Sequence, residues 1–306
     1  MNWKMILLCT IWGTNWVVMS TALYYFSPLM FSALRFMLGS AVLLLFCLIR
    51  KIPLPKKEDW KWYALCGVLQ ISCVFAITQS ALQFVEIGIA SILAFTMPFW
   101  LTMMAHFFIP GEQMTRFHLL GLGIGFGGLF LVLDVNPWAL EWTGTVFVVQ
   151  TLCLIAAVSW ATASLIIKKV LNGRNQIQLT AYQMVVGTIV LFLFTFTIES
   201  EPMASWNGMA VFCLIFAGVI ASALAYFLWS HILSSGGAGQ SSISLLLVPV
   251  IGTLSGWVFL GETLAVDTLV GIGLVLAGIW IVNRKQTGAE KKGPPAPVNH
   301  QQKGAL

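Results

Sequence analysis

Apolar residues dominate the chain in long runs, and short polar stretches separate one run from the next. A helix of about 20 apolar residues is long enough to cross the hydrocarbon core of a bilayer, which is about 30 Å thick. Ten such runs follow one another along the sequence. We therefore expect ten membrane-spanning helices, at about residues 4–24, 30–49, 62–84, 87–109, 117–134, 144–167, 178–198, 208–232, 239–260 and 267–283.

The composition excludes a soluble globular protein. Of the 306 residues, 58% are hydrophobic and only 9% are charged, whereas an ordinary soluble domain has about 25% charged residues. The first apolar run starts almost at Met1 and has no small-residue cleavage site after it, so we interpret it as a retained helix rather than a signal peptide. The sequence predicts an all-α membrane protein.

The cations are distributed unevenly over the predicted loops. Fifteen of the sixteen Lys and Arg residues fall on the side that holds both termini, and the sixteenth, Arg35, lies inside the second run. Loops rich in Lys and Arg stay in the cytoplasm. We therefore expect both termini to be cytoplasmic, which requires an even number of crossings and agrees with ten.

An internal repeat divides the chain into two five-helix units, residues 1–143 and 144–286. Because five is odd, the second unit enters the membrane from the opposite side, which gives an inverted-topology pair of the kind that underlies alternating access. Residues 287–306 lack apolar periodicity and aromatics, and we expect a disordered cytoplasmic tail. The aligned features are residues 33–39 with 181–187, Trp12 with Trp160, Pro98 with Pro249, Gly111-Glu112 with Gly261-Glu262, and the glycine-rich runs 121–128 with 271–278.

These features resemble the EamA-type permeases of the drug/metabolite transporter superfamily over about residues 4–283. The resemblance is carried by Trp12-Gly13, Arg35-Phe36, the two prolines, the two Gly-Glu dipeptides and the glycine-rich runs. It implies a carrier in the bacterial cytoplasmic membrane, commonly an exporter of amino acids, metabolites or toxic small molecules, with a central cavity lined by both repeats. The second repeat departs from the first at Gln183, which stands where the first has Arg35.

Several polar and aromatic side chains within the runs are candidates for lining a cavity. Trp12 and Asn15 share one helical face, and an amide cannot face lipid without leaving its donors and acceptors unpaired. The alternatives are a helix–helix hydrogen bond for Asn15 and an interfacial aromatic belt for Trp229. The predicted cavity residues are Trp12, Asn15, Gln79, Trp160, Tyr226 and Trp229.

Two prolines and one arginine stand out within the apolar runs. Pro98 and Pro249 occupy matching places in the two repeats, where a proline interrupts helical hydrogen bonding, so we predict paired hinges. Proline is also common in membrane helices, which is the alternative explanation. Arg35 is a costly charge inside a membrane and marks a functional candidate unless it snorkels to the interface.

The remaining features narrow the possible functions. No acid pair, HExxH motif or Ser/His constellation falls within a run, and the six cysteines form no CxxC pair, so we expect no catalysis, metal or cofactor. The cations form no aromatic-interleaved patch, which argues against nucleic acid. We expect a secondary transporter of a neutral, zwitterionic or modestly amphipathic molecule, with a homodimer possible at the glycine-rich runs. A passive channel and, with less support, an embedded enzyme are the alternatives.

Overall fold

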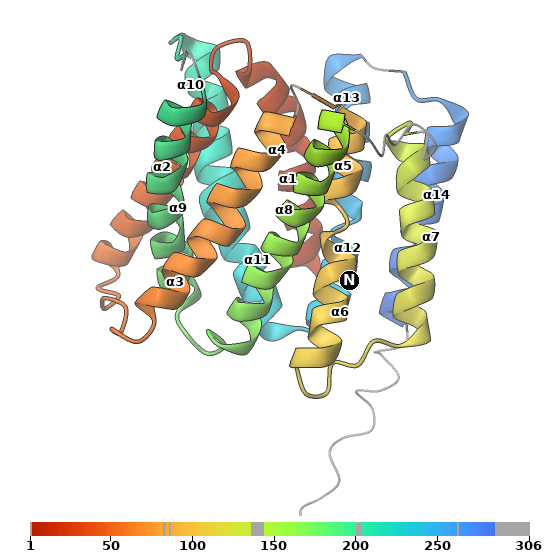
Figure 1. Cartoon of the computed structure of the whole chain (residues 1–306), viewed down its shortest axis with the longest axis horizontal. Coiled ribbons are helices and arrows are strands. Elements are labelled where there is room, and N and C mark those ends of the chain that lie inside the picture. Colours follow the sequence, from red (N-terminus) through yellow and green to blue (C-terminus); the bar gives the residue numbers. More distant parts are fainter. Residues whose placement is uncertain are drawn as a thin grey trace, which may run out of the picture.

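The computed structural model describes residues 2–81, 84–85, 87–135, 144–199, 203–261 and 263–284. These residues form a bundle of helices with steep axes (Figure 1), and the expected disordered tail lies outside them. The first half contains α1 (Trp3–Ala22), α2 (Pro28–Ile49), α3 (Trp60–Gly67), η1 (Val68–Cys73), α4 (Val74–Ala81), α5 (Ile87–Ala94), α6 (Met97–Phe108) and α7 (Arg116–Val132). The second contains α8 (Gly144–Lys169), α9 (Gln176–Ile198), α10 (Gly208–Ile215), η3 (Phe216–Leu224), α11 (Ala225–Ser235), α12 (Ala238–Ser244), α13 (Leu247–Leu260) and α14 (Val266–Arg284).

These helices form ten membrane-crossing segments. Nine apolar helices within the described residues have at least 18 residues, counting α3–η1–α4 and α10–η3–α11 each as one helix and α5–α6 and α12–α13 each as one span. The tenth, α7, has 17 residues and is also apolar, which is within the range that crosses a bilayer. The predicted all-α membrane fold with ten segments is confirmed.

The fourth segment of each half is broken near its middle. Residues 95–96 separate α5 from α6, and residues 245–246 separate α12 from α13. Pro98 and Pro249 lie in the first turn of the helix that follows each break. The N–H groups of a first turn have no partner within their own helix, so proline is tolerated there. The prolines thus follow a break instead of kinking a continuous helix.

The third segment of each half contains a π-helical stretch, η1 in the first half and η3 in the second. Such stretches are rare and are frequent at functional sites. Trp12 of α1 donates its indole N–H to the carbonyl of Ala221 inside η3, with an N···O distance of 3.1 Å. A side chain from another segment therefore stabilises this irregular backbone.

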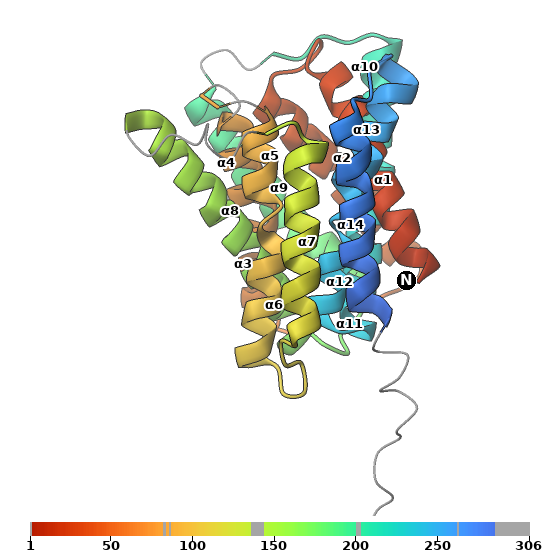
Figure 2. The ribbon, with the colours of Figure 1, turned by 90° about the vertical axis from the view of Figure 1, so that its right-hand side faces the viewer.

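The two halves pack against each other through matching helices. Helix α2 packs along α9, and α7 lies beside α14 in both views (Figures 1 and 2). Glycines permit the close approach of α7 and α14, because a Cβ added at Gly128 would lie 2.6 Å from the Gly271 carbonyl oxygen and one at Gly121 would lie 2.7 Å from that of Gly278. Gly121 and Gly128 of α7 align with Gly271 and Gly278 of α14 in the repeat, so each contact is the symmetry counterpart of the other.

The described cations other than Arg35 gather at one end of the bundle, the lower end in Figure 1. Helices α2, α6, α8, α11 and α14 end there, and α1, α3, α7, α9 and α12 begin there. Ion pairs join the loops at this end, including Arg174 with Glu58 at 3.1 Å and with Asp59 at 3.0 Å. We call this end of the molecule the basic end.

Candidate functional site

A cavity of about 180 Å³ lies between the two halves. Helices α1, α2, α4, α5 and α6 contribute from the first half, and α8, α11 and α13 contribute from the second. The lining residues are Trp12, Asn15, Trp16, Met19, Arg35, Val74, Phe75, Thr78, Gln79, Ala90, Ser91, Ala94, Phe95, Met97, Trp160, Tyr226 and Val248.

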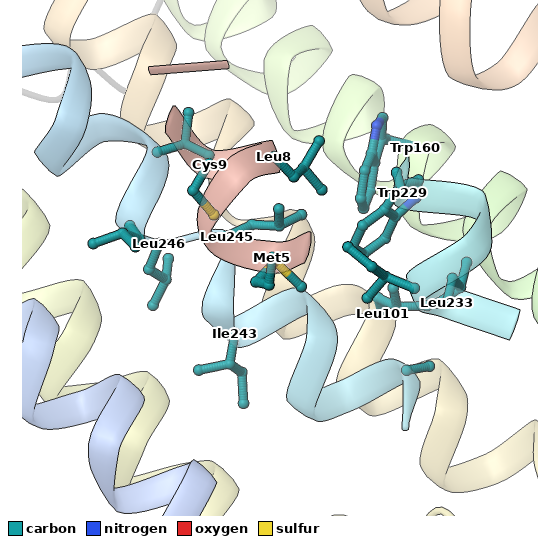
Figure 3. Packing of buried hydrophobic residues seen from close by; sticks show 14 of the residues in the cluster. Met5, Leu8, Cys9, Leu101, Trp160, Trp229, Leu233, Ile243, Leu245 and Leu246 are labelled. Carbon is teal, nitrogen blue, oxygen red and sulfur yellow. The ribbon is translucent and has the colours of Figure 1, made fainter. Parts of the chain in front are cut away.

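The cavity lies away from the basic end of the bundle. Its lining extends to Gln79 in the last turn of α4 and to Ala90 in α5, near the opposite end. Toward the basic end, large apolar side chains fill the bundle, as Figure 3 shows. This layer includes Met5, Leu8, Leu101, Trp229, Leu233 and Ile243. Buried hydrophobic packing therefore separates the cavity from the basic end.

A polar cluster closes the basic end of the bundle, on the side of the apolar layer that faces away from the cavity. Glu112, in the connection between α6 and α7, accepts a hydrogen bond of 2.6 Å from the backbone N–H of Ala238. Its other carboxylate oxygen lies 3.6 Å from Lys168 Nζ in α8, and Lys168 also donates to the Gly236 carbonyl. We call Glu112, Lys168 and residues 236–238 the basic-end latch, because it joins connections from both halves.

Aromatic rings form one wall of the cavity and continue below it. The rings of Trp12 and Tyr226 meet edge to face with centroids 5.5 Å apart, and Tyr226 meets Phe36 in the same way at 5.6 Å. Trp160 packs on Trp229 at 4.8 Å, and both are visible in Figure 3. Such walls bind apolar or planar ligands, because aromatic pairs of this geometry are rigid and present large apolar surfaces.

Two amides and one guanidinium line the same cavity. Asn15 and Gln79 are buried, and Asn15 Oδ1 has no hydrogen-bond partner among the described residues. Arg35 is 2% exposed and donates from Nη1 to the sulfur of Met19 at 3.3 Å. These groups supply donors and an acceptor on an otherwise apolar wall, which is the usual composition of a small-molecule site.

The structure brings together most of the residues that the sequence singled out. The cavity is lined by Trp12, Asn15, Gln79, Arg35, Trp160 and Tyr226. Trp229 lies outside the lining: it is fully buried and donates its indole N–H to Ser164 Oγ at 3.3 Å. Pro98 and Pro249 also lie outside the lining, at the helix breaks.

The sequence analysis did not identify Phe75, Thr78 and Ser91, which also line the cavity. Phe75 precedes Gln79 by four residues on α4, so the two share one helical face. That spacing was the available signal for Phe75. Ser91 had no comparable signal, because small hydroxyl residues are common at helix–helix contacts in membranes.

The side chains that could hold a metal ion in the described part of the chain are those of His, Cys, Asp and Glu. No group of three or more His, Cys, Asp or Glu residues that could hold a metal ion occurs there. The six cysteines are free thiols and lie within helices. The groups that the lining offers to a ligand include aromatic faces, two amides and one guanidinium.

Comparison with known proteins places this architecture in a family. The EamA-like transporter family matches the chain twice, at residues 2–134 and 148–284. The uncharacterized transporter YoaV of Bacillus subtilis is 30% identical over 273 residues, which cover 89% of this chain and 92% of the relative. A probable amino-acid metabolite efflux pump of Salmonella typhimurium is 27% identical over 90% of this chain and 92% of its own length.

A solved crystal structure shares the fold. It superposes with a TM-score of 0.80 at 17% sequence identity and covers 94% of this chain and 98% of its own. Similarity at this identity concerns the fold alone, and it agrees with the ten-segment architecture. The two family matches, the similarity to YoaV and the helical bundle lead to one conclusion: the chain is a multi-pass membrane protein that belongs to the EamA-like transporter family.

Proposed function

We propose that the chain is a secondary transporter that exports a small metabolite, an amino acid or a drug-like compound by alternating access. The observation that carries the proposal is a cavity between the halves that is sealed from the basic end by an apolar layer and a polar latch. A carrier needs a central site that is closed toward one face of the membrane at a time. The names of the relatives, an uncharacterized transporter and a probable amino-acid metabolite efflux pump, support this proposal.

The orientation that we propose places both termini and the basic end in the cytoplasm of a bacterium. The supporting evidence is the concentration of Lys and Arg at that end, because cytoplasmic loops carry the excess of positive charge. In this orientation the cavity belongs to a state that faces outward. Reporter fusions at Gly111 and Ser205 test the orientation, since these two positions lie at opposite ends of the bundle.

For the change between facing states we propose movement at the two broken segments. Residues 95–96 and 245–246 occupy equivalent places in the two halves, and neither break is spanned by a continuous α-helix. A break of this kind absorbs a change in backbone angles at less cost than the middle of an intact helix. Movement at one break opens the outer side, and the equivalent movement at the other opens the inner side.

A flux assay in proteoliposomes tests the proposed transport directly. Purified protein is reconstituted and screened with radiolabelled amino acids and cationic dyes, with and without a pH gradient. We expect saturable flux and counterflow, in which an unlabelled substrate on one side drives accumulation of the labelled one. Flux that rises linearly with concentration and shows no counterflow would indicate a channel. Saturable transport of phosphorylated sugars alone would contradict the proposed substrate range.

A further inference from the structure

The side chain of Arg35 is a buried cation that has no counter-ion among the described residues. It projects from α2 in the middle of the bundle and is 2% exposed. Among the described residues no carboxylate lies within ion-pair distance, and Nε has no hydrogen-bond partner. The hydrogen bond that the guanidinium does make goes to the thioether of Met19, a weak acceptor. A buried charge is costly without a partner. The charge of the guanidinium and its Nε–H group are therefore available to a ligand.

Two aromatic rings fix the position of this guanidinium. Its central carbon lies 4.7 Å from the ring centroid of Phe36 and 4.6 Å from that of Phe75. Rings at this distance stabilise a cation electrostatically but accept no in-plane hydrogen bond. The guanidinium carries its N–H donors in its own plane, in a fork that matches the two oxygens of a carboxylate. The rings therefore hold the fork in place without satisfying it.

We infer that Arg35 binds the carboxylate of the transported molecule, an inference that rests on the proposed transport function. The ligand class is a small carboxylate with an apolar or aromatic body. The carboxylate pairs with the guanidinium, and the body lies against Trp12, Tyr226 and Trp160. A charge-assisted bidentate pair in a site shielded from water is among the stronger polar interactions available to a ligand.

The charge balance of the lining favours a single negative charge. Arg35 is the one cation among the seventeen lining residues that the structure describes, and none of these seventeen is acidic. A phosphate ester carries close to two negative charges at neutral pH and would leave one of them without a partner in the lining. A simple carboxylate leaves none. An amino acid adds an ammonium group, for which Asn15 Oδ1 is an unoccupied acceptor.

Equilibrium binding to the purified full chain in neutral-lipid nanodiscs tests this inference. The probes are 3-phenylpropionate, its neutral amide 3-phenylpropanamide, and phenethylamine, which carries a cation instead. Measured by calorimetry, the carboxylate should bind about tenfold or more tightly than the amide, because only the carboxylate forms the charge-assisted bonds. Phenylalanine separates the two sources of the carboxylate: tighter binding than phenylpropionate indicates an amino acid, and weaker binding indicates a simple organic acid.

Variants then assign the preference to Arg35. In Arg35→Gln the ratio of the two affinities should fall to near one while the amide binds as before, and Arg35→Lys should give an intermediate ratio. Gln183→Leu is the matched control, because Gln183 is buried at the equivalent position of the second half but does not line the cavity. The control should keep the ratio of the unmodified chain.

Three results would overturn the inference. They are equal binding of acid and amide by the unmodified chain, an unchanged ratio in Arg35→Gln, and no binding of any carboxylate at millimolar concentration. The comparison of probes on the unmodified chain stands even where a variant fails to fold. Failure of the transport proposal looks different: carboxylates bind with the expected preference, but the proteoliposomes show no counterflow.

Discussion

Trp12 makes contacts in two directions from one position on α1. Its ring lines the cavity and meets Tyr226, while its indole N–H holds the carbonyl of Ala221 in the π-helical stretch η3. The residue therefore presents the ligand with an aromatic face that is held in place by a hydrogen bond. A mobile ring of the same size would lose more conformational freedom when a ligand binds.

Replacing this tryptophan should weaken binding more than it weakens folding. In Trp12→Ala we expect the affinity for the transported compound to fall about tenfold, because the aromatic face is lost. Calorimetry on the purified variant measures the affinity. Trp257→Ala is the matched control, since Trp257 is 50% exposed on the outside of α13. Equal affinity in the Trp12 variant and the unmodified chain would remove Trp12 from the site.

At the scale of helices, the breaks in the fourth segment of each half carry a prediction about flux. Alanine at position 98 or 249 supplies an N–H group that proline lacks, which lets a helical hydrogen bond form across the break. We expect either substitution to lower flux about tenfold while binding stays within a few-fold, because a continuous helix favours one facing state. Flux and affinity are measured on the same preparations.

The control for this experiment is Pro110→Ala, since Pro110 is exposed in the turn after α6. Its flux should equal that of the unmodified chain. If Pro98→Ala and Pro249→Ala both transport normally, the breaks are features of packing and play no part in the change of state.

The glycines of α7 provide a second prediction at this scale. Gly128 lies against α14, where an added Cβ would meet backbone atoms at 2.6 Å and 2.8 Å, whereas nothing lies within 4 Å of a Cβ added at Gly127. Gly128→Ala should therefore cost about 1 to 3 kcal/mol of stability through overpacking, and Gly127→Ala should cost none. Apparent melting temperatures in detergent compare the two. A similar melting temperature for both variants would contradict the contact.

The sequence predicted segments better than it predicted irregularities within them. Ten apolar runs and paired prolines indicated ten crossings and two interruptions, because bilayer thickness and the missing proline N–H act locally. The π-helical stretches had no such signal. Their register depends on partners from other segments, such as Trp12, which bonds to Ala221 across 209 positions.

Helical spacing predicted which side chains share the face that lines the cavity. It did not predict how far along the helix the cavity extends. Spacing on α1 indicated that Trp12 and Asn15 point the same way, and both line the cavity. Trp229 follows Tyr226 by three residues, so helical spacing places both side chains on one face. Three residues are also a rise of about 4.5 Å along the axis, which takes Trp229 below the cavity and against Ser164. Sequence spacing alone does not show where a cavity ends.

At the scale of the whole molecule, the basic-end latch joins connections from both halves. Under the proposed mechanism we expect its strength to contribute to the balance between facing states. Lys168→Met removes the ion pair with Glu112 and the bond to the Gly236 carbonyl. We expect this variant to shift the population toward opening at the basic end, about fivefold for a partly buried pair. The consequence is faster access of solutes to the apolar layer from that end.

Cysteine labelling measures this access. The reporter is Thr102→Cys, in a background without the six native cysteines, because Thr102 is buried and lines a second cavity of about 480 Å³ beside Glu112. A membrane-impermeant maleimide added at the basic end should label it faster in Lys168→Met. The adjacent Lys169→Met is the control, since Lys169 lies outside the latch and near the ring of Phe108. Equal labelling rates in all three proteins would show that the latch does not hold this end closed.

The first half has Arg35 at the position where the second half has Gln183. This difference between the halves has a kinetic consequence. A carrier built from identical repeats would present the same environment to a ligand from either side, because changing state would only swap the roles of the halves. Here the cation belongs to one half, so in the proposed mechanism we expect the inward and outward forms to differ in energy and in affinity. The concentration gradients still fix the direction of net flux. The half-saturating concentrations measured from the two faces of the membrane should nevertheless differ. The face with the higher half-saturating concentration should also have the higher maximal rate.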